Sequence, residues 1–262
     1  MTDLSQLPPP EALHDGPLAG THRWTFVIAG VEQIGSDLRR LRLAAPELER
    51  LDPAPGQDLM IAVPTGAAGE DGTVPTINRR YSIRAVDDST GSPQVVVDVV
   101  THGSGPGARW ASTAAVGDRV SAVGPRGKIV PVAYAAAHLF VADAAGAPAS
   151  LSMLESLPEG TGHALLVVET PDQLQPTTAP DQSLTWLVGA DPTEIEAALT
   201  TALRSEARRS GVQVYLAGER SQVARWRTVV RSAGVTDERV KWKAYWSRGA
   251  ANAAHGEPAR EG

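Results

Sequence analysis

The sequence predicts a two-domain protein in which an antiparallel six-stranded β-barrel is followed by an α/β domain with a parallel sheet. Up to about residue 134, short apolar segments alternate with Gly- and Pro-rich turns, and only one segment has helical character. This pattern is typical of a small antiparallel barrel. After that residue, strand-like segments alternate with helical segments. Such alternation predicts a parallel sheet flanked by helices.

The barrel domain is expected over residues 21–134, after a disordered tail over residues 1–20 that contains three consecutive prolines. One helix is expected to begin at Gly105, with Pro106 in its first turn, and a loop rich in Gly, Pro and Thr covers residues 64–78. The six strands are expected at residues 24–29, 38–43, 58–63, 79–84, 94–100 and 118–123.

The α/β domain is expected over residues 135–249, before a disordered tail over residues 250–262. Helices are expected at residues 148–157, 192–210 and 221–233, and the second of them places its apolar residues at the three-and-four spacing of an amphipathic helix. The strands are expected at residues 138–142, 164–169, 184–188, 212–217 and 240–246.

The amino-acid composition excludes several classes of biochemical function. The 262 residues include 42% hydrophobic and 21% charged residues, as in soluble globular proteins, and they contain no cysteine. Iron–sulfur clusters, thiolate metal sites and cysteine catalysis are therefore excluded, so we expect no metal site and any redox chemistry requires a bound organic cofactor. A formal net charge of -6 argues against a nucleic-acid partner. Without a long apolar run or a secretory signal, we expect no membrane insertion and a cytoplasmic location.

The sequence Arg79-Arg80-Tyr81-Ser82 indicates a binding site for a flat anionic ligand. On a strand, alternate side chains share a face, so Arg79 and Tyr81 can reach the same ligand. A guanidinium group binds phosphate with two hydrogen bonds, a phenol ring packs on a conjugated ring system, and the Ser82 hydroxyl can bind a further polar group. A flavin dinucleotide has these parts, although the motif alone also fits a basic surface strand.

A second candidate segment is the Gly-rich turn that leads into the predicted helix. It contains His102, Gly103, Gly105 and Pro106. Such a turn exposes backbone N–H groups at the positive end of a helix dipole, where a pyrophosphate can bind. Alone, the segment is equally compatible with an ordinary turn.

Together these segments resemble the siderophore-interacting protein family of flavin-dependent ferric-siderophore reductases, a branch of the ferredoxin-reductase-like superfamily. The likeness covers nearly the whole chain and rests on motifs in a fixed order. They are Arg79-x-Tyr81-Ser82, His102-Gly103-x-Gly105-Pro106 with Trp110-Ala111, Gly124-Pro125-Arg126-Gly127, Asp143 with Pro148-Ala149, Ala217-Gly218-Glu219 and Tyr245-Trp246-x-Arg248-Gly249.

The resemblance implies that the barrel holds FAD and that the α/β domain receives NAD(P)H or presents a surface to a protein electron donor. The implied reaction is reduction of ferric iron in a siderophore chelate, with release of iron(II) for iron uptake. FAD contacts are implied for Arg79, Tyr81, Ser82, His102, Gly103, Gly105 and Pro106, and cofactor contacts in the second domain for Asp143, Gly218 and Glu219.

Basic residues near the end of the chain are candidates for binding the anionic chelate. Lys241 and Lys243 share a face of the last predicted strand by its period of two, and Arg248 follows that strand. On the preceding helix, Arg220, Arg227 and Arg231 share one side. These cations would attract a ferric chelate. The same pattern also fits a solvated basic surface, and Arg220 could instead meet the ribose phosphate of a nicotinamide.

Two departures from the family pattern bear on function. Asp143 is followed by Ala144-Ala145-Gly146 where the family carries Glu-Thr, and Gly107-Ala108 stand where it carries Ala-Ser. The first departure removes polar groups near the expected nicotinamide site. Two alternatives therefore remain: a flavoenzyme of secondary metabolism with a changed donor or substrate, and a non-catalytic module that binds a flavin or a chelate.

Overall fold

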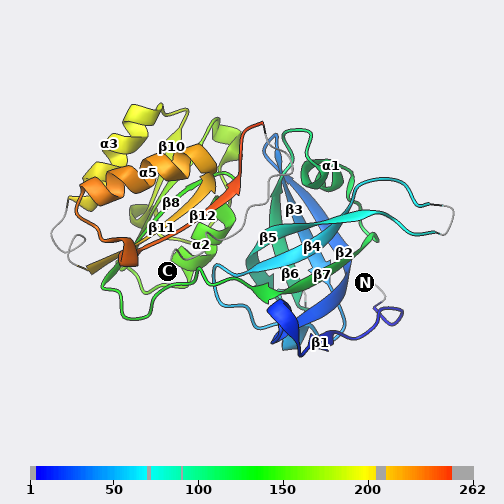
Figure 1. Cartoon of the computed structure of the whole chain (residues 1–262). Helices are drawn as coiled ribbons and strands as arrows, with labels where there is room; N and C mark the ends of the chain where they lie inside the picture. The colour runs from blue at the N-terminus through cyan, green and yellow to red at the C-terminus, as the bar shows by residue number, and fades with distance from the viewer. Residues whose placement is uncertain (1–3, 70–71, 90, 205–210, 250–262) are drawn as a thin grey trace. The chain divides into compact units, whose positions relative to one another are not determined.

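The computed structural model describes residues 4–69, 72–89, 91–204 and 211–249 (Figure 1). It divides into two compact units, Met1–Val130 and Pro131–Gly262. The sequence-based boundary, between residues 134 and 135, lies slightly later in the chain. The predicted tail over residues 250–262 and the end of the helix predicted over residues 192–210 lie outside the described residues.

The first unit is a closed barrel of six antiparallel strands, as predicted. The order around the barrel is β2-β3-β6-β5-β4-β7, and β7 returns to pair with β2, where Phe26 lies opposite Val120. The strands are β2 (Thr21–Ile34), β3 (Leu38–Ala44), β4 (Asp58–Pro64), β5 (Thr76–Asp87), β6 (Gln94–Val100) and β7 (Arg119–Arg126), and a 3-10 helix, η2 (Leu48–Arg50), follows β3.

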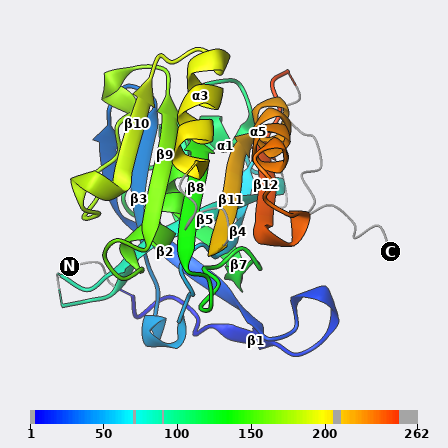
Figure 2. The same cartoon turned by 90° about the vertical axis from the view of Figure 1, so that its left-hand side faces the viewer.

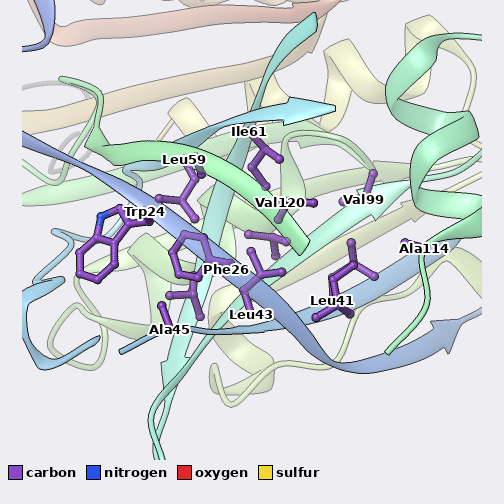
Figure 3. Packing of buried hydrophobic residues seen from close by; sticks show 14 of the residues in the cluster. Trp24, Phe26, Leu41, Leu43, Ala45, Leu59, Ile61, Val99, Ala114 and Val120 are labelled. Carbon is purple, nitrogen blue, oxygen red and sulfur yellow. The ribbon is translucent and has the colours of Figure 1, made fainter. Parts of the chain in front are cut away.

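Alternate residues of the strands fill the barrel with one hydrophobic core (Figure 3). Trp24, Phe26 and Ile28 of β2 are completely buried, because positions two apart on a strand point to the same side. Helix α1 (Pro106–Thr113) adds Trp110 and Ala111 to this core. Each buried large apolar side chain contributes about 1.5–3 kcal/mol. The barrel is therefore a firm support for β5 and α1, which carry the candidate FAD residues.

The prediction of a disordered tail over residues 1–20 is wrong for its described part. Strand β1 (Glu11–Leu13) pairs antiparallel with the first residues of β2, and the 3-10 helix η1 (Gly16–Leu18) lies between the two strands in the chain (Figure 2). Leu7 is also buried and packs with Val27 and Ala44. These contacts order the segment because they bury apolar side chains and satisfy backbone groups along β2.

The second unit contains the predicted parallel sheet, with strand order β10-β9-β8-β11-β12. Every neighbouring pair of strands in it is parallel. The strands are β8 (Ala137–Asp143), β9 (Gly162–Val168), β10 (Leu184–Val188), β11 (Val212–Glu219) and β12 (Val240–Trp246). The carboxyl ends of β8 and β11, which are neighbours, bring Asp143 close to Gly218 and Glu219.

Helices cover both faces of this sheet. Helices α3 (Pro192–Leu203) and α5 (Arg220–Ser232) share a core with Leu139 and Val141 of β8. Helix α2 (Ala147–Glu155) lies on the other face, where Leu154 occupies the space beside Gly162. None of the helices in the described part is long and apolar enough to span a membrane. Short 3-10 helices complete the unit: η3 (Pro171–Gln173), η4 (Asp181–Ser183) and η5 (Asp237–Arg239).

Helix α3 begins with a capping box that allows a stability prediction. The Asp191 carboxylate accepts from the N–H groups of Thr193 (2.7 Å) and Glu194 (2.9 Å), and the Glu194 carboxylate accepts from the Asp191 N–H (2.8 Å). We expect Asp191→Ala to destabilise the unit by about 1 kcal/mol, because those N–H groups lose their acceptor. Asp191→Asn keeps the acceptor and serves as the control. Urea unfolding measures both, and equal midpoints for the two variants would contradict the prediction.

Candidate functional site

Arg79 and Tyr81 lie on one face of β5, against the first turn of α1. A Cβ atom placed on Gly107 would lie 2.3 Å from the Tyr81 hydroxyl oxygen and 3.8 Å from Cγ of Arg79. Both side chains are half-buried. The structure thus brings together the two segments that the sequence placed about twenty residues apart, a strand motif and a Gly-rich turn.

The first turn of α1 has the features of an anion site. Gly105 is its N-cap residue, with extended backbone angles (φ -67°, ψ 155°), and Pro106 occupies the first turn. Within the described residues, no side chain makes the N-cap hydrogen bond of this helix. Its leading N–H groups therefore suit a phosphate oxygen. Arg79 adds a positive charge to this region: its Cγ lies 3.8 Å from the position of a Cβ atom on Gly107, and its Nη1 donates to the Asn78 carbonyl oxygen at 2.9 Å. The residues present fit the pyrophosphate of a dinucleotide.

The rest of the Gly-rich turn is more open. His102, Gly103 and Ser104 are exposed, and Gly103 adopts the left-handed conformation (φ +90°) that a glycine accepts without strain. The Arg109 guanidinium group donates back to the Ser104 carbonyl oxygen and holds the turn against the helix. His102 is therefore accessible from solvent at the start of this turn.

Tyr81 is a neutral aromatic group in this site. Burial raises the pKa of its hydroxyl group well above the usual value, although the Arg79 charge acts in the opposite direction. Its ring centroid lies 5.7 Å from that of Trp110, with an angle of 39° between the ring planes. Because Trp110 belongs to the barrel core, this contact supports the Tyr81 ring.

The other face of β5 has a structural role that the motif did not reveal. Arg80 Nε lies 2.9 Å from Oδ1 of Asp58, and Arg80 Nη2 lies 2.6 Å from Oδ2. Asp58 is buried on β4, so this two-bond ion pair joins β4 to β5. Ser82 follows on the same face by the strand alternation and is also buried.

Two further contacts that sequence reasoning missed hold the surroundings of the site. Arg39 of β3 donates from Nη1 to the Ala111 carbonyl oxygen of α1 at 2.5 Å. Trp24 donates from Nε1 to the Gly124 carbonyl oxygen at 3.0 Å, and a Cβ atom on Gly124 would lie 2.7 Å from Cδ2 of Leu59. The Gly124-Pro125-Arg126-Gly127 motif therefore includes a close-packed position where β7 meets β4. The only sequence signal for the contact of Arg39 with α1 is the alternation of basic and apolar residues over residues 38–43.

Asp143 is a buried acceptor at the carboxyl end of β8. Its Oδ1 accepts from the N–H groups of Ala145 (2.9 Å) and Gly146 (3.0 Å). Its Oδ2 accepts from the N–H of Glu219 (2.8 Å) and the indole N–H of Trp246 (2.8 Å). Burial raises the pKa of Asp143 above its usual value, and the hydrogen bonds from these donors offset only part of that rise. The carboxylate thus ties β8, β11 and the end of β12 together.

Gly218 leaves the space that this carboxylate needs. A Cβ atom on Gly218 would lie 2.7 Å from Cγ of Asp143, closer than any real contact, and its backbone has φ +148°. No other residue type fits at this position without moving the carboxylate. Gly218 therefore contacts Asp143 directly, and its contact with a cofactor stays a prediction.

Glu219 plays a related part at the start of α5. Its Oε2 accepts from the N–H groups of Ser221 (2.6 Å) and Gln222 (3.1 Å), and also from the Ser221 hydroxyl group. Its Oε1 accepts from the N–H of Arg248 at 3.3 Å. Although burial raises the pKa of Glu219, these hydrogen bonds hold it below the usual range. Glu219 thus connects the start of α5 to the segment after β12.

The predicted chelate-binding residues differ in exposure. Lys243 is buried and its Nζ lies 5.1 Å from the ring centroid of Tyr245, while Lys241 is half-buried, with its Nζ 6.0 Å from the ring centroid of Tyr215. Burial lowers the pKa of Lys241. Arg248 is exposed. Of these three cations, Arg248 is therefore the most accessible from solvent.

Two of the three predicted arginines on α5 contact other residues of the same unit. Arg227 lies over the Trp242 ring, 4.3 Å from its centroid, and Arg231 lies 3.6 Å from Asp237. Arg220 is exposed at the start of the helix. The predicted basic side of α5 therefore includes two cations with contacts inside the unit.

Comparisons with known proteins match both units to one family. Residues 27–129 match the model of the siderophore-interacting FAD-binding domain, and residues 135–249 match that of the siderophore-interacting protein. Ferric vibriobactin reductase ViuB of Vibrio cholerae is 27% identical over 188 residues, which cover 69% of this chain and 68% of that protein.

Two solved structures resemble the chain over most of its length. A siderophore utilization protein from T. fusca is 26% identical, with a TM-score of 0.73, and the match covers 91% of this chain and 97% of that one. The siderophore-interacting protein SipS from Aeromonas hydrophila is 25% identical, with a TM-score of 0.69, and the match covers 87% and 92%. These matches confirm the resemblance that the motifs indicated.

The acceptor role of Asp143 leads to a testable expectation. In Asp143→Asn, an amide N–H₂ group replaces one carboxylate oxygen and faces N–H donors. We expect the second unit to lose about 1–3 kcal/mol of stability, because buried donors remain unsatisfied. Thermal unfolding measures the effect. Glu238→Gln, which neutralises an exposed carboxylate of the same unit, is the control. Equal unfolding temperatures for the two variants would contradict the assigned role.

Proposed function

The chain belongs to the siderophore-interacting protein family, and we propose that it is an FAD-dependent oxidoreductase that reduces ferric iron in a siderophore chelate and releases iron(II). The observation that carries the proposal is the meeting of Arg79 and Tyr81 with the first turn of α1. The start of a helix that suits a phosphate, an arginine and a neutral aromatic ring are close to one another in the barrel unit. This combination suits a flavin dinucleotide.

The proposal gives each barrel residue a role in holding FAD. Arg79 and the leading N–H groups of α1 bind the pyrophosphate, with Gly103, Gly105 and Pro106 shaping the turn. Tyr81 packs on a flat part of the cofactor, and His102 supplies a polar contact. Ser82 lies buried on the opposite face of β5, so only its backbone groups could meet a ligand that packs on Tyr81. Bound FAD supplies the electron-transfer chemistry. We propose that binding is non-covalent, and the absence of cysteine from the chain excludes a thioether bond to the flavin.

In the second unit, Asp143, Gly218 and Glu219 lie at the carboxyl ends of parallel strands, where open α/β sheets bind ligands. We propose that they serve an NAD(P)H donor by fixing Trp246 and the backbone at Arg248. A protein donor is the alternative electron source. The proposal places the reaction in the cytoplasm, where reduced nicotinamides are available.

The anionic chelate is proposed to bind through Arg248, with Lys241 and Lys243 adding to the positive potential of the region. A guanidinium group suits the carboxylate or catecholate oxygens of such a ligand because it donates several hydrogen bonds in one plane. Iron leaves after reduction because hard oxygen chelators hold iron(II) less tightly than iron(III). No acid–base residue is required for this step.

One observation favours a second candidate, a flavoenzyme with a different donor or substrate. The turn after Asp143 contains two half-buried alanines, and the Gln175 side chain donates to the Ala144 carbonyl oxygen at 3.0 Å. A nicotinamide that bound beside this turn would meet alanine side chains in place of polar partners. A module that binds flavin without turnover is the third candidate.

The purified protein tests these candidates. We expect a flavin absorbance spectrum, or uptake of added FAD, and bleaching of that spectrum when a reductant is added without oxygen, followed by its return when a ferric chelate is added. A protein that binds FAD but never passes electrons to a ferric chelate would leave only the second and third candidates.

Substitution of Tyr81 tests the proposed cofactor site. We expect Tyr81→Ala to weaken FAD binding several-fold, because loss of one aromatic contact costs about 1 kcal/mol or more. Tyr134→Ala is the control, since Tyr134 is 93% exposed and belongs to the other unit. Titration of FAD fluorescence gives both dissociation constants. If the wild-type protein neither contains nor takes up FAD, the central proposal is lost.

The turn after Asp143 gives a prediction about the donor. We expect slow flavin reduction by NADH and NADPH, and faster reduction in the Ala144→Glu, Ala145→Thr double variant. Polar side chains there would orient the nicotinamide ring, and a misplacement of about one ångström can lower a rate on the order of a hundredfold. Anaerobic stopped-flow absorbance measures both rates. Fast and identical rates in the two proteins would show that the turn does not control the donor step.

A further inference from the structure

The hydroxyl group of Tyr81 occupies space that exists only because residue 107 is a glycine. A Cβ atom on Gly107 would lie 2.3 Å from the hydroxyl oxygen and 3.6 Å from Cζ of the same ring. The first distance is far shorter than any real contact of a Cβ atom, whereas the second is an ordinary contact. The conflict is therefore with the hydroxyl oxygen alone.

Gly107 is also an unexpected residue for its place in α1. It lies in the first turn of an eight-residue helix, directly after Pro106, and it is buried. Alanine favours a helix more than glycine does, so helix formation gives no reason for a glycine here. The absence of a side chain instead suits the close approach of another group.

Further contacts hold the Tyr81 ring and helix α1 in place around the space that Gly107 leaves. The Tyr81 ring packs against the Trp110 ring, and Trp110 is 6% exposed and belongs to the barrel core. Helix α1 is held in turn by the bond from Arg39 Nη1 to the Ala111 carbonyl oxygen. The hydroxyl end and one side of the ring are therefore both set by parts of the barrel that pack firmly.

We propose that Gly107 is a positioning residue that fixes the orientation of the Tyr81 ring for FAD. This inference rests on the proposed function, because it takes FAD as the ligand of the ring. A ring held in place before binding loses less conformational entropy when the cofactor packs on it. A side chain at position 107 would rotate Tyr81 out of the space beside Gly107 and misalign the ring face on which FAD packs.

A different role for Gly107 follows from its place in the helix, and an experiment can distinguish that role from the positioning of Tyr81. A glycine in the first turn of a helix can let a pyrophosphate approach the backbone. In that case, alanine would interfere with FAD itself, whatever residue stands at position 81. If the conflict is instead with the Tyr81 hydroxyl group, removing that oxygen relieves it.

The test uses Gly107→Ala, Tyr81→Phe and the double variant, each as the full chain. Gly66→Ala is the matched control, because a Cβ atom there meets only Pro75 Cγ at 3.5 Å and Gly66 has no proposed role in binding. Three quantities are measured: the FAD dissociation constant, the visible spectrum of bound flavin, and the near-ultraviolet circular dichroism of the apoprotein.

We expect Gly107→Ala to weaken FAD binding about fivefold or more and to shift the flavin spectrum. In the apoprotein, its aromatic circular dichroism should change while its far-ultraviolet spectrum stays that of the wild type. The double variant should bind FAD within about twofold of Tyr81→Phe alone, because the conflict is gone. Gly66→Ala should behave as the wild type.

Two results would overturn the inference. One is wild-type aromatic circular dichroism in the Gly107→Ala apoprotein. The other is an equal loss of FAD affinity from Gly107→Ala whether it is introduced into the wild-type protein or into the Tyr81→Phe variant, and this result would support the pyrophosphate role. If the wild-type protein does not bind FAD, the proposed function fails, while the apoprotein spectra still test the contact between Gly107 and Tyr81.

Discussion

Closure of the barrel by the pairing of β2 with β7 is the constraint on which the candidate FAD site depends. Once the strands follow the order β2-β3-β6-β5-β4-β7, strand β5 lies between β6 and β4. Helix α1 follows β6 in the chain and packs on β4 and β6. Because β5 lies between these two strands, α1 lies close to β5 as well. The strand motif and the Gly-rich turn meet for this reason, and the apolar core inside the barrel holds them there.

The carboxyl edge of the sheet in the second unit is organised around a buried carboxylate, in addition to the apolar core beneath its helices. Asp143 accepts hydrogen bonds from three backbone N–H groups and one indole N–H, which belong to the turn after β8, to β11 and to β12. Each of these donors would cost about 1–3 kcal/mol if it were buried without an acceptor. The carboxyl edge of the sheet therefore keeps its shape only with an acceptor at this position. A residue that resembled a cofactor ligand in the sequence thus has a clear structural task.

The sequence was informative where a local period determines the structure. Alternation of apolar residues located the barrel strands, because a strand with one buried face imposes a period of two. Strand β1 was missed because it spans only Glu11–Leu13 and depends on its pairing with β2. The pairing of Arg80 with Asp58 was missed because the two residues are far apart in the chain and meet only when β4 and β5 pair. Proximity of Gly107 to Tyr81 was hidden for the same reason.

Two glycines, Gly218 within a motif and Gly107 directly after one, mark close contacts within the protein, not only places where a ligand meets backbone. Gly107 makes room for the Tyr81 hydroxyl group, and Gly218 makes room for the Asp143 carboxylate. In each case the polar group that needs the room is itself a motif residue, so the glycine and its partner form one functional pair. A sequence motif read residue by residue assigns such a glycine to the ligand. The distances show that a side chain added at either glycine would meet that motif residue within the protein, so substitutions at these glycines must be interpreted through that partner.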